Sequence, residues 1–210
     1  AIKRAEAALG IAQELDDTDL IVLAHYRLAT ALHHLGNYRA ATISADKARE
    51  LVDTKMDRRL FRFGGLVYSF CCSFQAWGLA ELGELRRAEA AGRLGMELAE
   101  QAKHGYSISV ASFGLATGYL ASEQWDAAIA VLGRGLEQME LHGVNAAFGW
   151  VGARLAYAFA AAGRVEQGDL GDLEAQVGGV GAAAGDGRPH LDGEAGGGQL
   201  SAGEVDRDRH

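Results

Sequence analysis

Residues 67–99, VYSFCCSFQAWGLAELGELRRAEAAGRLGMELA, predict two α-helices joined by a tight turn. Apolar residues recur every three or four positions on both sides of residues 82–85, which is the spacing of one helix face. Four alanines would line the contact between the two helices: Ala76, Ala80, Ala88 and Ala91. Because small side chains let backbones approach closely, we expect an antiparallel pair of tightly packed helices.

The same pattern recurs along the chain. LATALHHLGNYRAATISADKA (28–48) lies upstream, LATGYLASEQWDAAIAVLGRGL (115–136) lies downstream, and LAYAFAAAGRVEQ (155–167) is a partial copy. The turns of the four copies are 47, 40 and 40 residues apart, at Gly36, Gly83, Glu123 and Gly163. A helix–turn–helix unit that repeats with such a period indicates an all-α solenoid, in which each unit packs on its neighbours.

We predict a helical repeat domain over residues 1–167, followed by a tail. The domain would hold a partial unit at 1–15, units at about 20–52, 66–103 and 107–142, and a partial unit at 145–167. Breaks between helices of neighbouring units are expected at residues 16–19, 53–65, 104–105 and 142–143. Because the chain opens inside a helical pattern, we expect it to be part of a longer protein.

The repeat pattern is lost in residues 168–210. Glycine is crowded there, while aromatic and β-branched residues are scarce. Such a composition buries too little apolar area to offset the conformational entropy that folding removes. We expect this tail to be disordered, or to be a non-native ending such as an out-of-frame sequence.

The overall composition predicts a soluble protein. The 210 residues, 49% of them hydrophobic, are enough to bury a core. A net charge of −8 argues against a nucleic-acid partner, because nucleic-acid-binding faces are usually basic. The longest apolar run, near residues 65–74, is too short for a membrane span, which needs ~20 apolar residues. Two adjacent cysteines and no signal segment favour a reducing, cytoplasmic location.

The repeats resemble the tetratricopeptide repeat (TPR). One pattern recurs over about residues 20–165. It consists of small residues, an aromatic residue and a glycine at the turn, followed by an aromatic residue or leucine with alanine three positions later. The resemblance implies a right-handed superhelical array of antiparallel helix pairs. The units here are longer than the usual ~34 residues, and the proline that often closes a repeat is missing.

Two stretches resemble a narrower group of proteins. The stretches are LFRFGG…FCCSFQAWGLAELGELRRAEAAGRLGMELAE (60–100) and HGYSISVASFGLATGYLASEQWDAAIAVLGRGLEQME (104–140). Both are similar to the C-terminal repeat regions of large bacterial regulators. Those regulators join an adenylate/guanylate-cyclase domain to an AAA-type ATPase. The resemblance implies a bacterial signal-transduction protein whose cyclase and ATPase chemistry lies elsewhere, since this chain has no GxxxxGK(S/T) phosphate loop.

The sequence predicts no catalytic, metal or cofactor site. His33 and His34 are adjacent, so on a helix they point about 100° apart and do not hold one metal ion together. We expect both to be exposed or to face a groove. Cys71 and Cys72 lack the C-x-x-C spacing of metal and redox sites, so we expect them to be buried small residues. We therefore expect that the protein is not an enzyme.

The tetratricopeptide resemblance also implies a partner-binding groove along the first helix of each unit. Its positions in this chain are Tyr26, Arg27, Thr30, His33, Ser73, Phe74, Trp77, Glu81, Phe113, Thr117, Trp150, Arg154 and Tyr157. Rigid aromatic side chains accompanied by a few charged residues are typical of protein-binding hot spots. The alternative for Phe74, Trp77 and Phe113 is that they pack between units as core.

We expect a non-catalytic protein-interaction or scaffold module that binds a peptide, a partner helix or another domain of its parent protein in this groove. The alternative is a regulatory region that binds a small-molecule effector for a cyclase or ATPase neighbour. A closed apolar pocket between Trp77, Phe113 and Trp150 would favour the effector, and an open groove with exposed charges would favour the peptide. A third option is a homo-oligomer formed through uncapped repeat ends.

Overall fold

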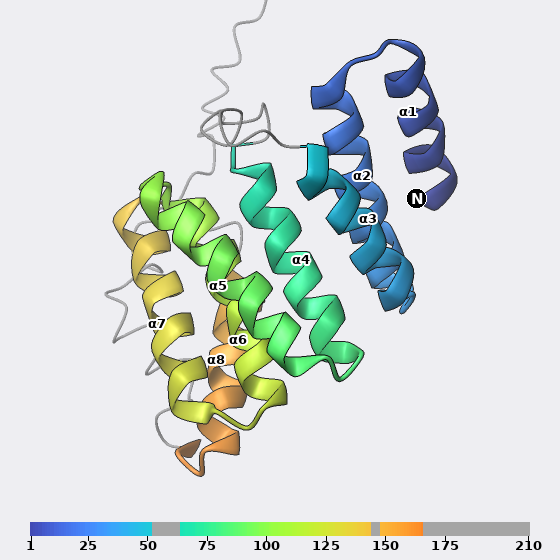
Figure 1. Ribbon diagram of the computed structural model, residues 1–210. Helices are drawn as coiled ribbons and strands as arrows, with labels where there is room; N and C mark the ends of the chain where they lie inside the picture. Colours follow the sequence, from blue (N-terminus) through green and yellow to red (C-terminus); the bar gives the residue numbers. More distant parts are fainter. Residues whose placement is uncertain (52–63, 144–147, 166–210) are drawn as a thin grey trace, which may run out of the picture.

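The computed structural model describes residues 1–51, 64–143 and 148–165, and every regular element in these ranges is an α-helix (Figure 1). The helices are α1 (Ile2–Glu14), α2 (Thr18–His34), α3 (Tyr38–Leu51), α4 (Val67–Glu81), α5 (Leu85–Gln101), α6 (Gly105–Ala121), α7 (Trp125–Leu141) and α8 (Phe148–Ala161). The predicted tail, 168–210, and most of the predicted connection at 53–65 lie outside the described residues.

The helices pack as a row of pairs (Figure 1). Each helix contacts the next one along the chain, and short turns make the two members of a pair antiparallel. The even-numbered helices also contact one another, because α4 touches both α2 and α6, and α6 touches α8. We call α2, α4, α6 and α8 the inner layer and the odd-numbered helices the outer layer. The predicted all-α array of helix pairs is confirmed.

The turns within the helix pairs share one backbone pattern. At Gly36 the φ angle is 75°, its N–H donates to the carbonyl three residues back, and the next N–H donates to the carbonyl five residues back. The same two hydrogen bonds end the helices before Gly83, Glu123 and Gly163, which also have positive φ angles. This is the Schellman motif, which satisfies the last carbonyls of a helix. All four turns lie at their predicted positions.

The break between α5 and α6 differs from the predicted one. The left-handed residue is Lys103, with φ of 52°, while His104 is the N-cap and Gly105 is already helical. Nδ1 of His104 accepts a hydrogen bond from the Ser107 N–H at 3.3 Å, and burial lowers the pKa of His104, so this nitrogen remains an acceptor. Gly105 allows a close contact instead of a turn, because a Cβ there would lie 2.1 Å from the His142 ring.

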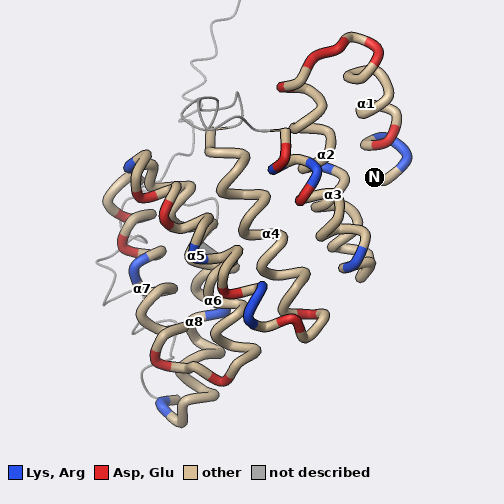
Figure 2. The backbone as a smooth tube through the Cα atoms, viewed as in Figure 1, with Lys and Arg blue, Asp and Glu red and all other residues tan. Residues whose placement is uncertain are grey.

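The central helices of the inner layer are almost free of charge. Helix α6 has no charged residue, and the only one in α4 is Glu81 near the turn. Charged residues are concentrated on α3, α5 and α7 instead (Figure 2). A helix that is apolar on every side is a buried one, and residues 107–120 of α6 are all buried. None of the described helices combines the length and the hydropathy needed to span a membrane.

Small residues fill the contact between α4 and α5, as predicted. Ala76, Ala88 and Ala91 are buried in one cluster with Leu79, and Ala80 packs against it. A row of small side chains of this kind brings the two helix axes close together. The alanine seam predicted from the sequence is confirmed.

Serine hydroxyls bridge the two layers at equivalent places in successive pairs. Ser69 Oγ donates to the Gly95 carbonyl at 2.8 Å between α4 and α5, and Ser109 Oγ donates to the Gly135 carbonyl at 2.9 Å between α6 and α7. The donor and the acceptor of the second bond each lie 40 residues after those of the first, and 40 residues is also the spacing of the last three turns. The repeat seen in the sequence is therefore also a repeat of contacts.

Candidate functional site

A row of aromatic side chains crosses the inner layer from α2 to α8. The ring centroid of Tyr26 lies 5.8 Å from that of Phe74, and the centroid of Phe74 lies 6.1 Å from that of Trp77. Trp77 lies 4.9 Å from Phe113, which lies 5.9 Å from Trp150. All four separations are in the contact range of aromatic pairs, so the row is continuous and each ring supports its neighbour.

The aromatic row lines a cavity of about 460 Å³, which we call the larger hollow. The lining residues are Tyr26, Arg27, Thr30, His34, Phe70, Phe74, Trp77, Tyr106, Val110, Phe113 and Trp150. Phe113 is buried, Phe74 and Trp77 are half-buried, and Trp150 is 44% exposed. The rings therefore combine the two roles that the sequence left open, since they pack between helices and also line a cavity.

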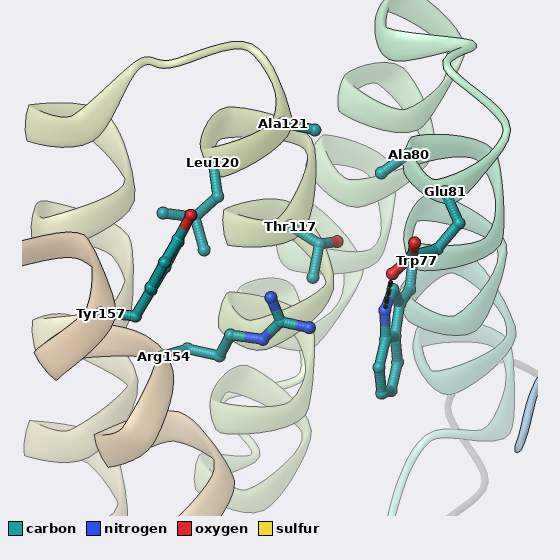
Figure 3. Close-up of a pocket in the computed structure, with 8 residues that line it drawn as sticks. All are labelled: Trp77, Ala80, Glu81, Thr117, Leu120, Ala121, Arg154 and Tyr157. Atoms are coloured by element: carbon teal, nitrogen blue, oxygen red, sulfur yellow. Dashed lines mark hydrogen bonds between the residues drawn. The ribbon is translucent and has the colours of Figure 1, made fainter. Parts of the chain in front are cut away.

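A second cavity, of about 240 Å³, lies between α4, α6 and α8 (Figure 3). We call it the smaller hollow, and its lining residues are Trp77, Ala80, Glu81, Thr117, Leu120, Ala121, Arg154 and Tyr157. Trp77 lines both hollows, so they are neighbours. The indole N–H of Trp77 donates to Glu81 Oε1 at 3.1 Å, which holds the ring in place as their shared wall.

The guanidinium of Arg154 reaches from α8 toward Trp77 across the smaller hollow (Figure 3). Its Cζ lies 5.6 Å from the ring centroid of Trp77 and 5.4 Å from that of Phe113, within cation–π range. The side chain is half-buried. Among the described residues, no carboxylate lies within 4.0 Å of it. Two ring faces, rather than an ion pair, thus position this cation.

A second arginine lies at the α2 end of the larger hollow. Arg27 is exposed, and its Cζ lies 5.5 Å from the ring centroid of Tyr26. Burial raises the pKa of Tyr26 to about 12, so its hydroxyl stays protonated and neutral. Arg27 thus contributes a cation at this end of the cavity.

His33 lies beneath the aromatic row and lines neither hollow, contrary to its predicted groove position. It is 5% exposed, and its ring centroid lies 4.0 Å from that of Trp77 and 5.0 Å from that of Tyr38. Its Nε2 has no hydrogen-bond partner among the described residues. Burial, together with the nearby His34 and Arg154, lowers the pKa of His33 to about 4, so the ring is neutral at pH 7.

Ser73 also lines neither hollow, although the sequence placed it in the groove. It is buried where α4 meets α6, and a Cβ on Gly114 would lie 2.5 Å from the Ser73 Cα. Its hydroxyl donates to the Ser69 carbonyl at 2.9 Å. The rotation of α4 about its axis turns this residue into the helix contact, while Phe74 and Trp77 face the cavity.

The structure brings the other eleven predicted positions together on the two hollows. Those on the larger hollow are Tyr26, Arg27, Thr30, Phe74, Trp77, Phe113 and Trp150. Those on the smaller hollow, besides Trp77, are Glu81, Thr117, Arg154 and Tyr157. Their role in binding a partner stays a prediction.

Sequence reasoning missed several residues of the larger hollow. Phe70 lies four residues before Phe74, and Tyr106 and Val110 lie seven and three residues before Phe113. Residues at these spacings share a helix face. The available signal was therefore the extension of each predicted face by one or two turns toward the N-terminus.

Reactive groups are scarce on the described part of the chain. Within it, no three His, Cys, Asp or Glu side chains are arranged to hold a metal ion. Cys71 and Cys72 are both buried, and burial raises the pKa of the Cys71 thiol, which keeps it unreactive. His25 is buried as well and hydrogen-bonds with Ser44 Oγ at 3.3 Å. The two hollows therefore offer rings and fixed charges for contact.

No protein-family model matches the chain, and no curated protein matches it. Among solved structures, it is similar to the crystal structure of BtubC (BKLC) from P. vanneervenii, with a TM-score of 0.60. The match covers 98% of this chain and 78% of that chain, at 16% sequence identity. The likeness is one of fold.

Proposed function

We propose that the chain is a non-catalytic protein-interaction or scaffold module, a TPR-like superhelical array whose inner layer binds an extended peptide, a partner helix or a neighbouring domain. The observation that carries this proposal is the aromatic row, which runs over the four helices of the inner layer and borders two neighbouring hollows. A row of rings along an array gives a partner segment several anchor points in sequence.

The rings support binding because they are held before a partner arrives. Trp77 contacts Phe74, Phe113 and His33 and is also hydrogen-bonded to Glu81, so little side-chain entropy remains to be lost on binding. The exposed end of the row supplies the driving force. A partner that covers the exposed part of Trp150 removes apolar area from water at about 25 cal/mol per Å².

The charges around the hollows favour an open groove over a sealed effector pocket. Arg27 and Glu81 are exposed, Arg154 is half-buried, and Tyr157 beside it is 55% exposed. A pocket that encloses a small molecule usually buries most of the ligand's surface, whereas a peptide groove leaves its polar rim in water. The exposure of Arg27, Glu81 and Tyr157 therefore supports a peptide or helix as the partner.

A second function, sensing of a small-molecule effector, is favoured by the size of the larger hollow. Its volume of about 460 Å³ lies within the range of ligand pockets, ~300–1,000 Å³. Such a sensor would be the regulatory region of a cytoplasmic bacterial signalling protein, as the cyclase–ATPase resemblance implies. Thermal-shift screening tests this function. It would be supported by a compound that raises the melting temperature of the wild-type chain but not that of the Trp150→Ala variant, together with the finding that no peptide binds the chain.

Self-association remains the third option and rests on a different surface. Ile11 of α1 and Leu15, the C-cap of that helix, are 58% and 64% exposed at the end of the array. A homo-oligomer formed there would dissociate on Ile11→Glu substitution, as measured by analytical ultracentrifugation, and would leave the aromatic row free.

The test of the peptide proposal is a selection of random dodecapeptides by display on the full 210-residue chain. Selected peptides are then titrated against wild type, Trp150→Ala and the matched control Ile43→Ala, which truncates a residue of similar exposure, 53% against 44%, on the outer layer. We expect unchanged affinity for the control and a loss of about tenfold or more for Trp150→Ala. No selected peptide, or peptides equally affected by both variants, would contradict the proposal.

A further inference from the structure

We propose that the partner segment carries a bulky apolar side chain and an acidic side chain within two residues of each other. The apolar side chain would enter the larger hollow, and the carboxylate would pair with Arg154. This inference rests on the proposed peptide-binding function and names the chemistry of its ligand.

The environment of Arg154 supplies the first argument. Its Cζ lies within cation–π range of two rings, and no carboxylate lies within 4.0 Å among the described residues. Arginine has five N–H donors at the edges of a plane, and a cation–π contact engages its charge without supplying a hydrogen-bond acceptor, so a ligand acceptor still finds donors here. A carboxylate accepts two of these N–H groups in parallel, with a geometry that an amide or an alcohol does not match.

The other charges on the cavity argue against a cationic ligand. Aromatic cages generally attract cations, which bind over the ring faces. Here guanidinium groups already lie over Tyr26, Trp77 and Phe113. The larger hollow has Arg27 and no acidic residue among its described lining residues. A ligand cation would meet two positive charges, and three of the rings already have a guanidinium group over them, whereas a carboxylate would be attracted.

The net charge of the chain sharpens this argument. At −8, the protein as a whole repels an acidic segment at long range. Preference for an acidic ligand must therefore arise at short range, from Arg154 itself. Added salt screens the long-range repulsion between the negatively charged protein and the acidic segment. The affinity for this segment should therefore fall less with added salt than it would if binding relied on an ion pair at the surface alone.

The layout of the two hollows sets the spacing of the two ligand groups. Trp77 borders both hollows, and Arg154 lies over Trp77 and Phe113, which are themselves in contact. The two subsites are thus separated by about one ring. In an extended segment, side chains two residues apart point the same way and are about 6.6 Å apart. An apolar residue followed or preceded by an acid at that spacing fits both subsites together.

Glu81 adds direction to the smaller hollow. Its carboxylate is held by Trp77 on the wall opposite Arg154 (Figure 3). A ligand carboxylate is repelled from that wall, while a backbone N–H or a basic side chain is attracted to it. The acidic residue of the ligand therefore pairs with Arg154. The part of the segment that passes Glu81 would present a backbone N–H or a basic side chain to it.

The inference is tested with four fluorescein-labelled peptides in glycine–serine flanks, titrated against the full chain by fluorescence anisotropy. Their cores are Phe-Ser-Glu, Phe-Ser-Gln, Phe-Ser-Lys and Ala-Ser-Glu. We expect Phe-Ser-Glu to bind about tenfold more tightly than Phe-Ser-Gln, as a charge-assisted hydrogen-bonded pair provides, with Phe-Ser-Lys and Ala-Ser-Glu weaker still. Equal binding of the Glu and Gln peptides, or tighter binding of the Lys peptide, overturns the inference.

Variants of the protein assign the preference to one residue. Arg154→Gln should remove the tenfold preference for Glu over Gln, while Arg154→Lys, which keeps the charge but not the planar fork, should retain part of it. The matched control is Arg39→Gln, which removes the same charge from an exposed position on α3. Circular dichroism melting verifies that all variants are folded. A preference that survives Arg154→Gln in folded protein overturns the assignment.

The failure of this inference differs from the failure of the proposed function. If display selection yields peptides that bind through Trp150 but contain no acid near their anchor, the groove binds peptides and the acidic preference is wrong. If neither the four probes nor any selected peptide binds the folded chain, the peptide-binding function itself is wrong.

Discussion

The two sides of helices α4 and α6 differ in the size of their side chains, and this difference separates stability from recognition. On the side where the helices meet each other and the outer layer, glycine, serine and alanine bring backbones into contact: a Cβ on Gly114 would lie 2.5 Å from the Ser73 Cα. On the other side, Trp77 and Phe113 project into the hollows.

Both sides are needed for a cavity to exist. Close approach of α4 and α6 fixes where their rings project, and the bulk of the rings holds the space above the contact open. Serine hydroxyls satisfy the carbonyls of Gly95 and Gly135, so the tight contacts leave those groups paired. We therefore expect substitutions on the small-residue side to change the free energy of unfolding, and substitutions of exposed rings to change mainly ligand binding.

The largest effect should come from Gly114→Val. Its side chain has no space beside the Ser73 backbone, so α4 and α6 must move apart, and we expect a loss of about 3 kcal/mol in the free energy of unfolding. Urea denaturation followed by circular dichroism measures it. A loss below about 1 kcal/mol would show that the backbone contact is looser than the structure has it.

The next effect concerns His33, which lies under the shared wall of the two hollows. Its pKa is about 4 in the folded protein and 6.5 as a free side chain, so between these values the unfolded chain binds a proton that the folded chain does not. Stability should therefore fall as the pH falls from 7 to 4.5, by about 2 kcal/mol from this residue alone.

The His33→Phe variant serves as the reference for that measurement, because it keeps a ring beside Trp77 without a titrating group. All other residues are the same in the two proteins, so their contributions cancel in the comparison. Urea unfolding at pH 7 and at pH 4.5 should show a smaller loss in His33→Phe. Equal losses would mean that His33 is as accessible to protons in the folded chain as in the unfolded one.

A ring at the exposed end of the row should behave differently. Trp150 is 44% exposed, so we expect Trp150→Ala to cost about 1 kcal/mol in the free energy of unfolding, well below the cost of Gly114→Val. Its effect on peptide affinity, measured by titration calorimetry, should be about tenfold or more. If the stability loss equals that of Gly114→Val, the ring belongs to the core and the division between the two sides fails.

The smallest effect should be of opposite sign. Gly133 is in the middle of α7, and a Cβ there would meet no atom within 4 Å. Gly133→Ala should therefore stabilise the protein by about 0.5 kcal/mol, because alanine loses less backbone entropy on folding than glycine does. A destabilised Gly133→Ala, measured by the same urea titration, would indicate tight packing that the structure does not show.

The repeat made much of this fold predictable from the sequence. The turns at Gly36, Gly83 and Gly163 have a residue that suits positive φ, and Glu123 was found by its spacing from them. Lys103 was missed because a lysine in the left-handed conformation has no signal of its own. Gly105, where the sequence predicts the break, is explained by its contact with His142.

The candidate site was predicted less completely, for a physical reason. Periodicity shows which residues share a helix face, so it predicts that Trp77 and Glu81 face the same way, and both line the smaller hollow. Periodicity does not give the rotation of a helix against its neighbours. Ser73 and His33 lie at the margin of their helix faces, and a modest rotation decides whether each meets a cavity or a neighbouring helix.

The most direct test of the central claim uses the three tryptophans as internal reporters. Trp77 and Trp150 line the larger hollow, while Trp125 is on the outer helix α7. In ¹⁵N NMR spectra of the full chain, addition of a selected peptide should shift the indole N–H signals of Trp77 and Trp150 and leave that of Trp125 in place. A peptide that shifts Trp125 and leaves the other two unchanged would contradict binding along the aromatic row.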